Sequence, residues 1–453
     1  MCGSCEYAIP AASLKTLRDE ILNEVARISH SGTLSPQERT LLRLIDERTL
    51  DGNTGLLYQK QLADDLGIPN AKQVGVVATR IRTKLTEYYE RLAGDSLLQI
   101  ALSDRGYEAF FTYRQAAVPL SEPAQAAVAN AKAALDQRTL PGIAAAIKHL
   151  QAAILLEPDH PLLLALTALS HATRAMYGTY PLSDLRKAEA IVRRMPAAPG
   201  GGRPWESWFA EACVSMALHW DWPAAEASFD RAIALSGGAA RRLPWYTAFL
   251  ASQGRAEEAV PLLRTAVSQN YDSPIVRADL ASNQILAGHY ADAQETIQTA
   301  FALFGDRTHY LLHVHKAILH EAMGDSAAAA AVIERVPLKW PQTTITLGLR
   351  ALFSGLAGDR KTARRHFRKL RGARLLAGHY IPAGQLCIAA LGAGDHDGAV
   401  EWLREGAVVE RDPNLVLTNV YPFFRHLREN GAFQALVQDT MRLKFPPAPA
   451  AQA

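Results

Sequence analysis

Long apolar runs are missing from this chain of 453 residues, and cysteine is scarce, with four in total. No apolar stretch approaches the length of roughly 18 residues that a membrane-spanning helix needs, so we expect no membrane partner. The opening sequence MCGSCEYAIP has no basic segment leading into an apolar run, so we expect no secretory signal. Four cysteines in so long a chain do not make a disulfide scaffold. These absences predict a soluble, cytoplasmic protein.

Signatures of catalysis are missing as well. The sequence has no Gly-Lys-Ser/Thr phosphate-binding motif, no Gly-x-Ser-x-Gly nucleophile elbow and no cluster of paired cysteines beyond its start. Its carboxylates are plentiful but scattered, as solvated helical hairpins require. We therefore expect no catalytic residues, no enzyme activity and no cofactor.

Two groups of possible metal ligands give only weak signals. Cys2 and Cys5 form a lone Cys-x-x-Cys without a second pair or nearby histidines. His309 and His313 lie one helical turn apart, but their HxxxH pattern lacks the glutamate of a zinc protease. An unstructured start explains the cysteines, and packing or surface positions explain the histidines. We expect no metal site, with ligation by either pair kept as the alternative.

The net charge of +3 is too small to mark the whole protein as a nucleic-acid binder, so any basic footprint must be local. One stretch, residues 70–92, holds five Lys or Arg against two Glu. Within it, apolar residues recur at intervals of three and four from Val74 to Tyr88, which predicts a helix over 73–89. Cations occupy the other faces of that predicted helix.

Shorter helices precede this one, and a hairpin follows it. Apolar spacing predicts a first helix over 13–28, and Ser35-Pro36 supplies the N-cap and first-turn proline of a second. A third, short helix is expected over 58–66. Strand formers on either side of a turn at 103–106 predict the hairpin. Helices and a hairpin at these spacings are typical of a helix-turn-helix with a wing.

Three segments carry a resemblance to a known family. They are LLRLIDERTLDG at 41–52, RIRTKLTEYY at 80–89 and LLQIALSDRGYEAFF at 97–111. Together they resemble the winged helix at the front of many bacterial transcriptional regulators and, more distantly, the effector domain of response regulators. The resemblance covers about residues 14–111, and it implies that a domain at 13–115 binds double-stranded DNA. Residues 1–12 are expected to be disordered.

Two positions depart from the pattern of that family. Gly75 stands between two valines where the family usually has an arginine, and Ser103 to Gly106 replaces its usual Pro-Lys-Gly approach to the hairpin. A mid-helix glycine costs about 1 kcal/mol relative to alanine, so we expect Gly75 to serve a close backbone approach. The missing arginine also removes a phosphate contact, which favours weaker DNA binding.

The resemblance and the charge pattern together indicate the side chains that could contact DNA. Polar residues near the start of the long helix are candidates for base contacts, and the later cations for phosphates or base edges. Arg80 and Lys84 share a face, whereas Arg82 points away from them and could bind the protein's own acids. The expected DNA-contacting set is Lys72, Gln73, Thr79, Arg80, Arg82, Thr83, Lys84 and Arg105. The alternative is a solvated helix in a module that binds protein.

After an Ala/Pro-rich linker at 116–123, alanine recurs at a nearly constant period. The recurring positions, 34 to 42 residues apart, are Ala146, Ala188, Ala225, Ala259, Ala293, Ala329, Ala363 and Ala399. A bulky apolar residue follows each by four positions, and a glycine precedes five of them by five positions. This spacing predicts paired helices whose apolar faces are buried by stacking against neighbouring pairs.

The period and the Ala-x3-bulky spacing resemble the tetratricopeptide repeat, in about eight copies. The expected fold class is mainly α, with the winged helix-turn-helix domain followed by a tetratricopeptide α-solenoid over 124–445. Residues 446–453 are expected to form a disordered tail. Cys213 and Cys387 fall where first helices cross closely, so we expect both to be small core residues.

The expected function is transcriptional regulation, in which the winged helix binds DNA and the solenoid senses an effector or recruits a protein or peptide partner. The concave wall of such a solenoid takes an extended peptide or a partner helix. The expected wall residues are Val214, Leu218, Arg277, Ile285, Val314 and Ile318. A possible homodimer would supply the two heads that palindromic sites need.

Two alternatives stay open. The first is a protein-interaction scaffold whose winged helix does not bind DNA, and steep salt dependence of DNA binding would argue against it. The second is a peptide-sensing receptor, which would carry asparagines on the inner wall to clamp a peptide backbone. Only Asn283 lies near such a position.

Overall fold

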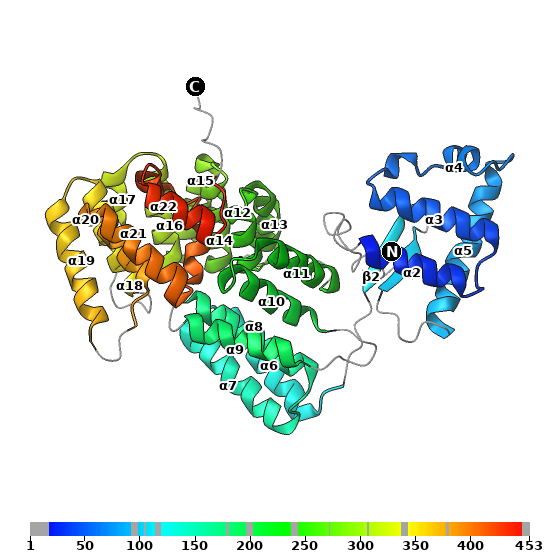
Figure 1. The fold of residues 1–453 in the computed structure, drawn as a ribbon, viewed down its shortest axis with the longest axis horizontal. Coiled ribbons are helices and arrows are strands. Elements are labelled where there is room, and N and C mark those ends of the chain that lie inside the picture. The colour runs from blue at the N-terminus through cyan, green and yellow to red at the C-terminus, as the bar shows by residue number, and fades with distance from the viewer. Residues whose placement is uncertain are drawn as a thin grey trace.

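The computed structural model describes the chain in ranges separated by short gaps. These ranges are 18–91, 98–103, 106–113, 119–177, 181–195, 203–236, 243–270, 272–305, 308–336, 343–376 and 380–445. They form a small N-terminal unit, here called the head (18–113), and a larger helical array, here called the solenoid (122–445) (Figure 1). Over these ranges no helix combines the length and apolar character needed to cross a membrane.

In its described residues, the head contains four α-helices followed by a two-stranded hairpin. Its helices are α2 (Arg18–His30), α3 (Pro36–Leu50), α4 (Gln59–Asp65) and α5 (Lys72–Arg91), with a 3-10 turn, η2 (Thr54–Leu56), before α4. Strands β1 (Leu98–Leu102) and β2 (Ala109–Tyr113) pair antiparallel, with Leu98 opposite Tyr113 and Leu102 opposite Ala109. The apolar faces of all these helices and of both strands meet in one core.

The described part of the solenoid comprises eight helix pairs in chain order. They are α6 (Glu122–Asp136) with α7 (Leu140–Leu156), α8 (Pro161–Met176) with α9 (Pro181–Arg194), α10 (Trp205–Ala217) with α11 (Trp222–Leu235), α12 (Pro244–Ser252) with α13 (Ala256–Gln269), α14 (Pro274–Leu286) with α15 (Tyr290–Phe304), α16 (Tyr310–Ala322) with α17 (Ser326–Glu334), α18 (Thr343–Leu356) with α19 (Arg360–Arg374), and α20 (Ala383–Ala393) with α21 (His396–Arg404). We call the first member of each pair a first helix and the other a second helix.

The recurring alanines explain how these pairs pack. All eight are completely buried, because each lies where a second helix approaches its neighbours closely. Glycines between the paired helices have φ between 74° and 94°, a left-handed conformation that ends a helix at little cost for glycine: Gly254, Gly288, Gly324, Gly358 and Gly394. Cys213 and Cys387 are buried free thiols in the same core.

The segment after α21 turns back onto the array. It contains η5 (Glu405–Glu410), η6 (Pro413–Leu417), η7 (Pro422–Leu427), α22 (Gly431–Ala435) and η8 (Leu436–Thr440). In this segment, η6 packs against the first helices α8, α10 and α12, and η7 packs against α16. The solenoid is therefore filled on its first-helix side by its own C-terminal segment (405–445), coloured orange to red in Figure 1.

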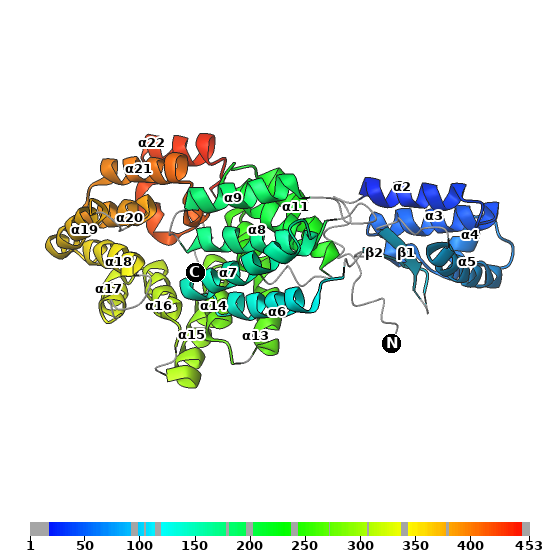
Figure 2. The same ribbon diagram turned by 90° about the horizontal axis from the view of Figure 1, so that it is seen from below.

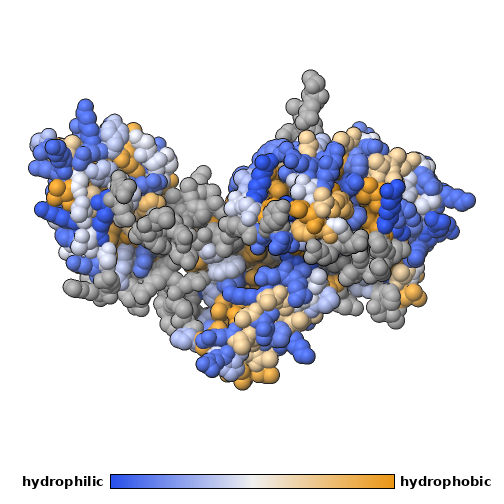
Figure 3. All heavy atoms as spheres, turned by 180° about the vertical axis from the view of Figure 1, so that it is seen from behind, coloured by the Kyte–Doolittle hydropathy of each residue, from blue (hydrophilic) through white to orange (hydrophobic). Residues whose placement is uncertain are grey.

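The head lies at one end of the molecule, as two perpendicular views show (Figures 1 and 2). It touches the solenoid through α11, because Arg231 pairs with Glu20 of α2 and Ala234 joins the core of the head. At the opposite end of the molecule, hydrophilic side chains project from the solenoid (Figure 3).

Candidate functional site

Helix α5 separates its residues into a buried face and an outward face. Its apolar residues at intervals of three and four pack into the head core: Val74, Val77, Ala78, Ile81, Leu85 and Tyr88. The outward face carries Lys72, Gln73, Val76, Thr79, Arg80 and Thr83, all exposed. Five of these six belong to the expected DNA-contacting set, and they share one surface of the helix.

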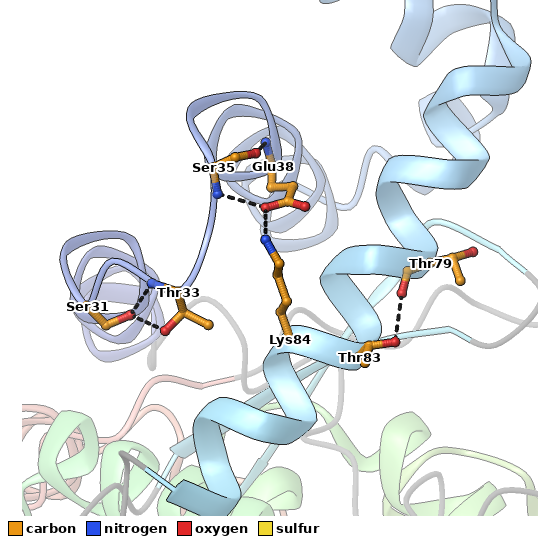
Figure 4. Close-up of polar contacts among 7 residues, drawn as sticks. All are labelled: Ser31, Thr33, Ser35, Glu38, Thr79, Thr83 and Lys84. Carbon is orange, nitrogen blue, oxygen red and sulfur yellow. Dashed lines mark hydrogen bonds and ion pairs between the residues drawn. The ribbon is translucent and has the colours of Figure 1, made fainter.

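Lys84 lies partly under the head surface rather than on the outward face. Its Nζ donates to Glu38 Oε2 over 2.7 Å, and the Ser35 backbone N–H donates to the same oxygen over 2.7 Å (Figure 4). Burial raises the pKa of Glu38, but the hydrogen bonds from Lys84 and Ser35 outweigh it and lower that pKa below its ordinary value. Lys84 is therefore committed to the N-terminal cap of α3, where its charge is neutralised.

Arg82 holds the hairpin against α5. Its Nε donates to the carbonyl oxygen of Ser103 over 2.8 Å, and its Nη2 donates to that of Gly106 over 2.7 Å. These acceptors are backbone carbonyls rather than the acidic side chains that the sequence offered as an alternative to DNA. The guanidinium fork can bridge two carbonyls at once, so Arg82 fixes the hairpin next to the outward face of α5.

Two cations on the outward face lack a partner among the residues that the structure describes. Arg80 and Lys72 are exposed, and neither side chain has a hydrogen bond or ion pair within the described ranges. Thr79 and Thr83 direct their hydroxyls to carbonyls of their own helix, at 2.9 Å and 3.3 Å. Arg105 lies outside the described residues. Fewer cations of α5 are therefore available to phosphate groups than its five basic residues imply.

Gly75 marks the place where α4 and the hairpin approach α5. A Cβ at this position would lie 3.0 Å from Gln59 Nε2 and 3.4 Å from the Tyr107 hydroxyl. Both neighbours are side-chain ends, whereas the sequence suggested a close approach of backbone. The glycine thus makes room for two polar side chains that border the outward face.

The expected partner-binding wall is not an open surface. Val214, Leu218, Arg277, Ile285, Val314 and Ile318 expose only 4 to 7% of their area. On α10 and α16 the C-terminal segment contributes to this burial through η6 and η7, whereas α14, which carries Arg277 and Ile285, packs against α12, α13, α15 and α16. The sequence prediction of an accessible wall at these residues is therefore corrected to a wall that the chain itself covers.

Polar side chains fasten this segment to the ends of three first helices. Each donates to a carbonyl in the last turn of a helix. The donor and acceptor pairs are Asn414 with Met176 of α8 (3.2 Å), Asn419 with Ser252 of α12 (2.7 Å) and Arg425 with Glu321 of α16 (3.4 Å). The carbonyl of Glu321 also accepts from the Gly324 N–H over 3.0 Å. Arg425 also forms an ion pair with the buried Glu321 side chain, because its Nη2 donates to Glu321 Oε1 over 2.7 Å. Apolar side chains between the donors complete the contact: Leu415, Val416, Phe423 and Phe424.

Sequence reasoning missed the role of this segment. Residues 413–427 have neither the alanine period nor the inter-helix glycine, so the repeat pattern does not distinguish them. The sequence therefore predicts this end of the chain only as part of the repeat region. The signal that could have found it is the spacing of Asn414, Asn419 and Arg425 between apolar pairs. The asparagines that contact helix ends belong to the segment, whereas Asn283 donates to Asp279 of its own helix.

The histidines of α16 belong to its packing. His309 is the N-cap, and its Nδ1 accepts from the Leu311 N–H over 3.3 Å. Burial, assisted by the charge of Arg138, lowers the pKa of His309 to about 4, and burial lowers the pKa of His315 to about 3. Within the described ranges, no group of three or more His, Cys, Asp or Glu residues could hold a metal ion. Cys2 and Cys5 lie outside those ranges.

Comparisons with known proteins identify the repeats. Residues 250–312 and 382–405 match the tetratricopeptide repeat family. The first stretch covers α13–α15 with the end of α12 and the start of α16, and the second covers α20–α21. The chain therefore carries tetratricopeptide repeats, as predicted, in a mainly helical solenoid. No curated protein matches the sequence significantly.

Several solved structures resemble the chain at low sequence identity. A tetratricopeptide repeat protein from Parabacteroides merdae is 16% identical, with 59% of this chain and 99% of that chain covered and a TM-score of 0.38. The human IFIT1 dimer with m7Gppp-AAAA is 12% identical, covering 89% and 96%, with a TM-score of 0.39. Yeast Tom70 is 12% identical, covering 94% and 90%, with a TM-score of 0.38.

Proposed function

We propose that the chain is a protein-interaction scaffold whose solenoid takes an extended partner segment along its first helices. The observation that carries the proposal is the way the C-terminal segment caps the ends of α8 and α12 and pairs with Glu321 near the end of α16. Helix C-terminal carbonyls carry partial negative charge and favour donors such as amides and guanidinium groups. A partner with amide or guanidinium donors between apolar anchors would satisfy the same acceptors.

In this proposal the C-terminal segment competes with the partner. A tethered segment acts at a high effective concentration, of millimolar order for a short flexible link. A partner must therefore bind more tightly than a free copy of the segment would, or the segment must first be loosened. Weakening the segment's own contacts should open the first-helix side to binding from solution.

The test uses a fluorescent peptide with the sequence of residues 411–428 and the full-length protein. The wild-type chain should bind it poorly, because its own segment occupies the site. The variant Asn419→Ala/Arg425→Ala should bind it at least tenfold more tightly, measured by anisotropy. A scrambled peptide and the variant Gln438→Ala, which alters an exposed side chain of η8, are the controls. Equal, weak binding to both folded proteins would contradict the proposal.

We further propose that the head is a winged helix that meets duplex DNA through the outward face of α5. The supporting observation is that Lys72, Gln73 and Arg80 lie exposed on one face. Arg82 secures the hairpin beside that face. Two free cations can neutralise about two phosphates, so we expect a shallow salt dependence, with a slope near −2 for this site alone. A DNA-binding head would make the scaffold a transcriptional regulator.

Photo-crosslinking locates this contact without relying on total affinity. A random duplex carrying photoreactive bases should crosslink to peptides from residues 72–83 of the full-length chain, identified by mass spectrometry. The variant Lys72→Gln/Arg80→Gln should lose these crosslinks while keeping its fold by circular dichroism. If no crosslink falls in α5, the head does not read DNA, and the scaffold without a DNA reader is the better description.

A further inference from the structure

Helix α19 has the most one-sided charge of any helix in the described ranges. Eight of its 15 residues are Arg or Lys, and none is Asp or Glu. It is a second helix of the solenoid, with the sequence RKTARRHFRKLRGAR. The whole chain has a net charge of only +3, so the net charge does not reveal the concentration of cations on this helix.

The cations of α19 point away from the solenoid. Ala363, Phe367 and Leu370 are buried, and the helix packs against α18 and α20. Seven basic side chains are exposed: Arg360, Lys361, Arg364, Arg365, Arg368, Lys369 and Arg371. None of the seven has an ion pair within the described ranges, whereas Arg374 in the last turn pairs with Glu410 at 2.8 Å.

These charges weaken the helix that carries them. Lys361 and Arg365, or Arg364 and Arg368, lie four residues apart on the same face and repel each other. Arg360 and Lys361 also stand in the first turn, where the helix dipole disfavours cations. A polyanion bound along α19 would offset the repulsion between these cations and would bind the cations of the first turn, where the helix dipole also favours an anion.

We propose that α19 binds the phosphate backbone of nucleic acid without regard to sequence. The helix spans about 21 Å, and a duplex presents about 12 phosphates over that length. Arginine, which supplies five of the seven exposed cations, matches phosphate oxygens with its planar fork. The site is separate from α5, because α19 and the head lie at opposite ends of the molecule in both ribbon views (Figures 1 and 2).

Nucleic acid fits this surface better than a membrane or a protein does. A membrane-surface helix inserts its apolar face between lipids, but the apolar face of α19 is buried in the solenoid. A protein interface needs apolar or aromatic anchors at its centre, and every exposed residue from Arg360 to Gly372 is a cation or glycine. The exposed apolar residues Leu375 and Leu376 lie beyond the C-terminal end of the helix and not among its cations. The hydrophilic end of the solenoid is visible from behind in Figure 3.

The test measures binding of the full-length chain to a random duplex of roughly 20 base pairs by anisotropy across a salt series. The variant Arg365→Gln/Arg368→Gln/Lys369→Gln removes three outward charges from α19. We expect its affinity to fall at least tenfold near 100 mM salt and its salt slope to shrink by about 2 to 3. The variant should remain folded, because the change relieves repulsion within the helix.

A matched control removes the same charge elsewhere. The variant Arg186→Gln/Lys187→Gln/Arg194→Gln neutralises three exposed cations of the second helix α9, and its affinity should stay within twofold of wild type. The head variant Lys72→Gln/Arg80→Gln should leave the contribution of α19 intact. Equal losses in the α19 and α9 variants would overturn the proposal. It would also be overturned if the chain bound vesicles rich in phosphatidylserine through α19 but not the duplex.

Discussion

Asp46 carries a carboxyl group that is buried in the head core. Its side chain is fully buried on α3, and neither carboxylate oxygen has a hydrogen bond within the described part of the chain. Burial, with a smaller contribution from the charge of Glu47, raises the pKa of Asp46 well above its ordinary value. The folded head therefore favours the neutral acid, and ionisation works against folding.

We predict that Asp46→Asn makes the head less sensitive to rising pH. Because the folded pKa exceeds the unfolded value of about 3.9, the contribution of Asp46 is complete below that value and is lost as pH rises through the folded pKa. The loss is up to about 1.4 kcal/mol per pH unit. Hydrogen exchange of α3 peptides in the full chain, compared between wild type and variant at pH 4 and pH 6, measures the difference, because the loss begins just above the unfolded pKa.

A second variant separates this effect from general changes in charge. Glu47→Gln alters the neighbouring carboxylate, which is paired with Arg43 on the surface, and we expect it to change exchange little at either pH. If hydrogen exchange of α3 depended on pH in the same way in wild type and Asp46→Asn, the ionisation of Asp46 would not destabilise the head.

At the scale of the element, α5 contains a glycine that its backbone does not require. We predict that Gly75→Ala stabilises α5 by about 0.5–1 kcal/mol, because alanine loses less conformational entropy in a helix. The added Cβ meets the end of the Gln59 side chain at 3.0 Å, which can move aside. Exchange of α5 amides in the full chain should slow accordingly.

Gly67 supplies the contrasting substitution. It has φ of +61°, so Gly67→Ala is strained although no atom lies within 4 Å of the added Cβ. We expect this variant to speed exchange in α4 and α5. If Gly75→Ala also speeds exchange, Gln59 and Tyr107 hold fixed positions against α5, and the glycine is required for their packing.

At the scale of the whole molecule, the C-terminal segment ties distant repeats together. Asn419 is almost fully buried, and its Nδ2 donates to Ser252 and to Lys444. We predict that Asn419→Ala lowers the stability of the solenoid by about 1–3 kcal/mol, because the buried carbonyl of Ser252 and the carbonyl of Lys444 lose their donor. All seven tryptophans lie between positions 205 and 402, so tryptophan fluorescence during urea unfolding reports on the solenoid and not on the head.

Tryptophan also reports on the segment directly. The indole N–H of Trp222 donates to the carbonyl oxygen of Met441 over 2.8 Å, so loosening the segment should shift the emission to longer wavelength before the main unfolding transition. Gln438→Ala, on the exposed side of η8, should leave both midpoint and emission unchanged. An unchanged midpoint in Asn419→Ala would mean that the segment is held by its apolar contacts alone.

The sequence by itself determined the local structure of this protein. The Ser35 capping box, the apolar period of α5 and the eight buried alanines are local patterns, because each depends on residues within about one repeat. The paired helices of the solenoid follow from the same short-range spacing. For this reason the tetratricopeptide repeats could be predicted before the structure was known.

Only the tertiary structure decided which of the predicted site residues are available. Lys84 meets Glu38 across 46 positions, and Arg82 meets Ser103 across 21. The C-terminal segment covers the first helices through contacts such as Asn419 with Ser252, across 167 positions. No periodic pattern encodes such pairings, because they arise when separate elements pack and compete for the same donors, acceptors and apolar surface.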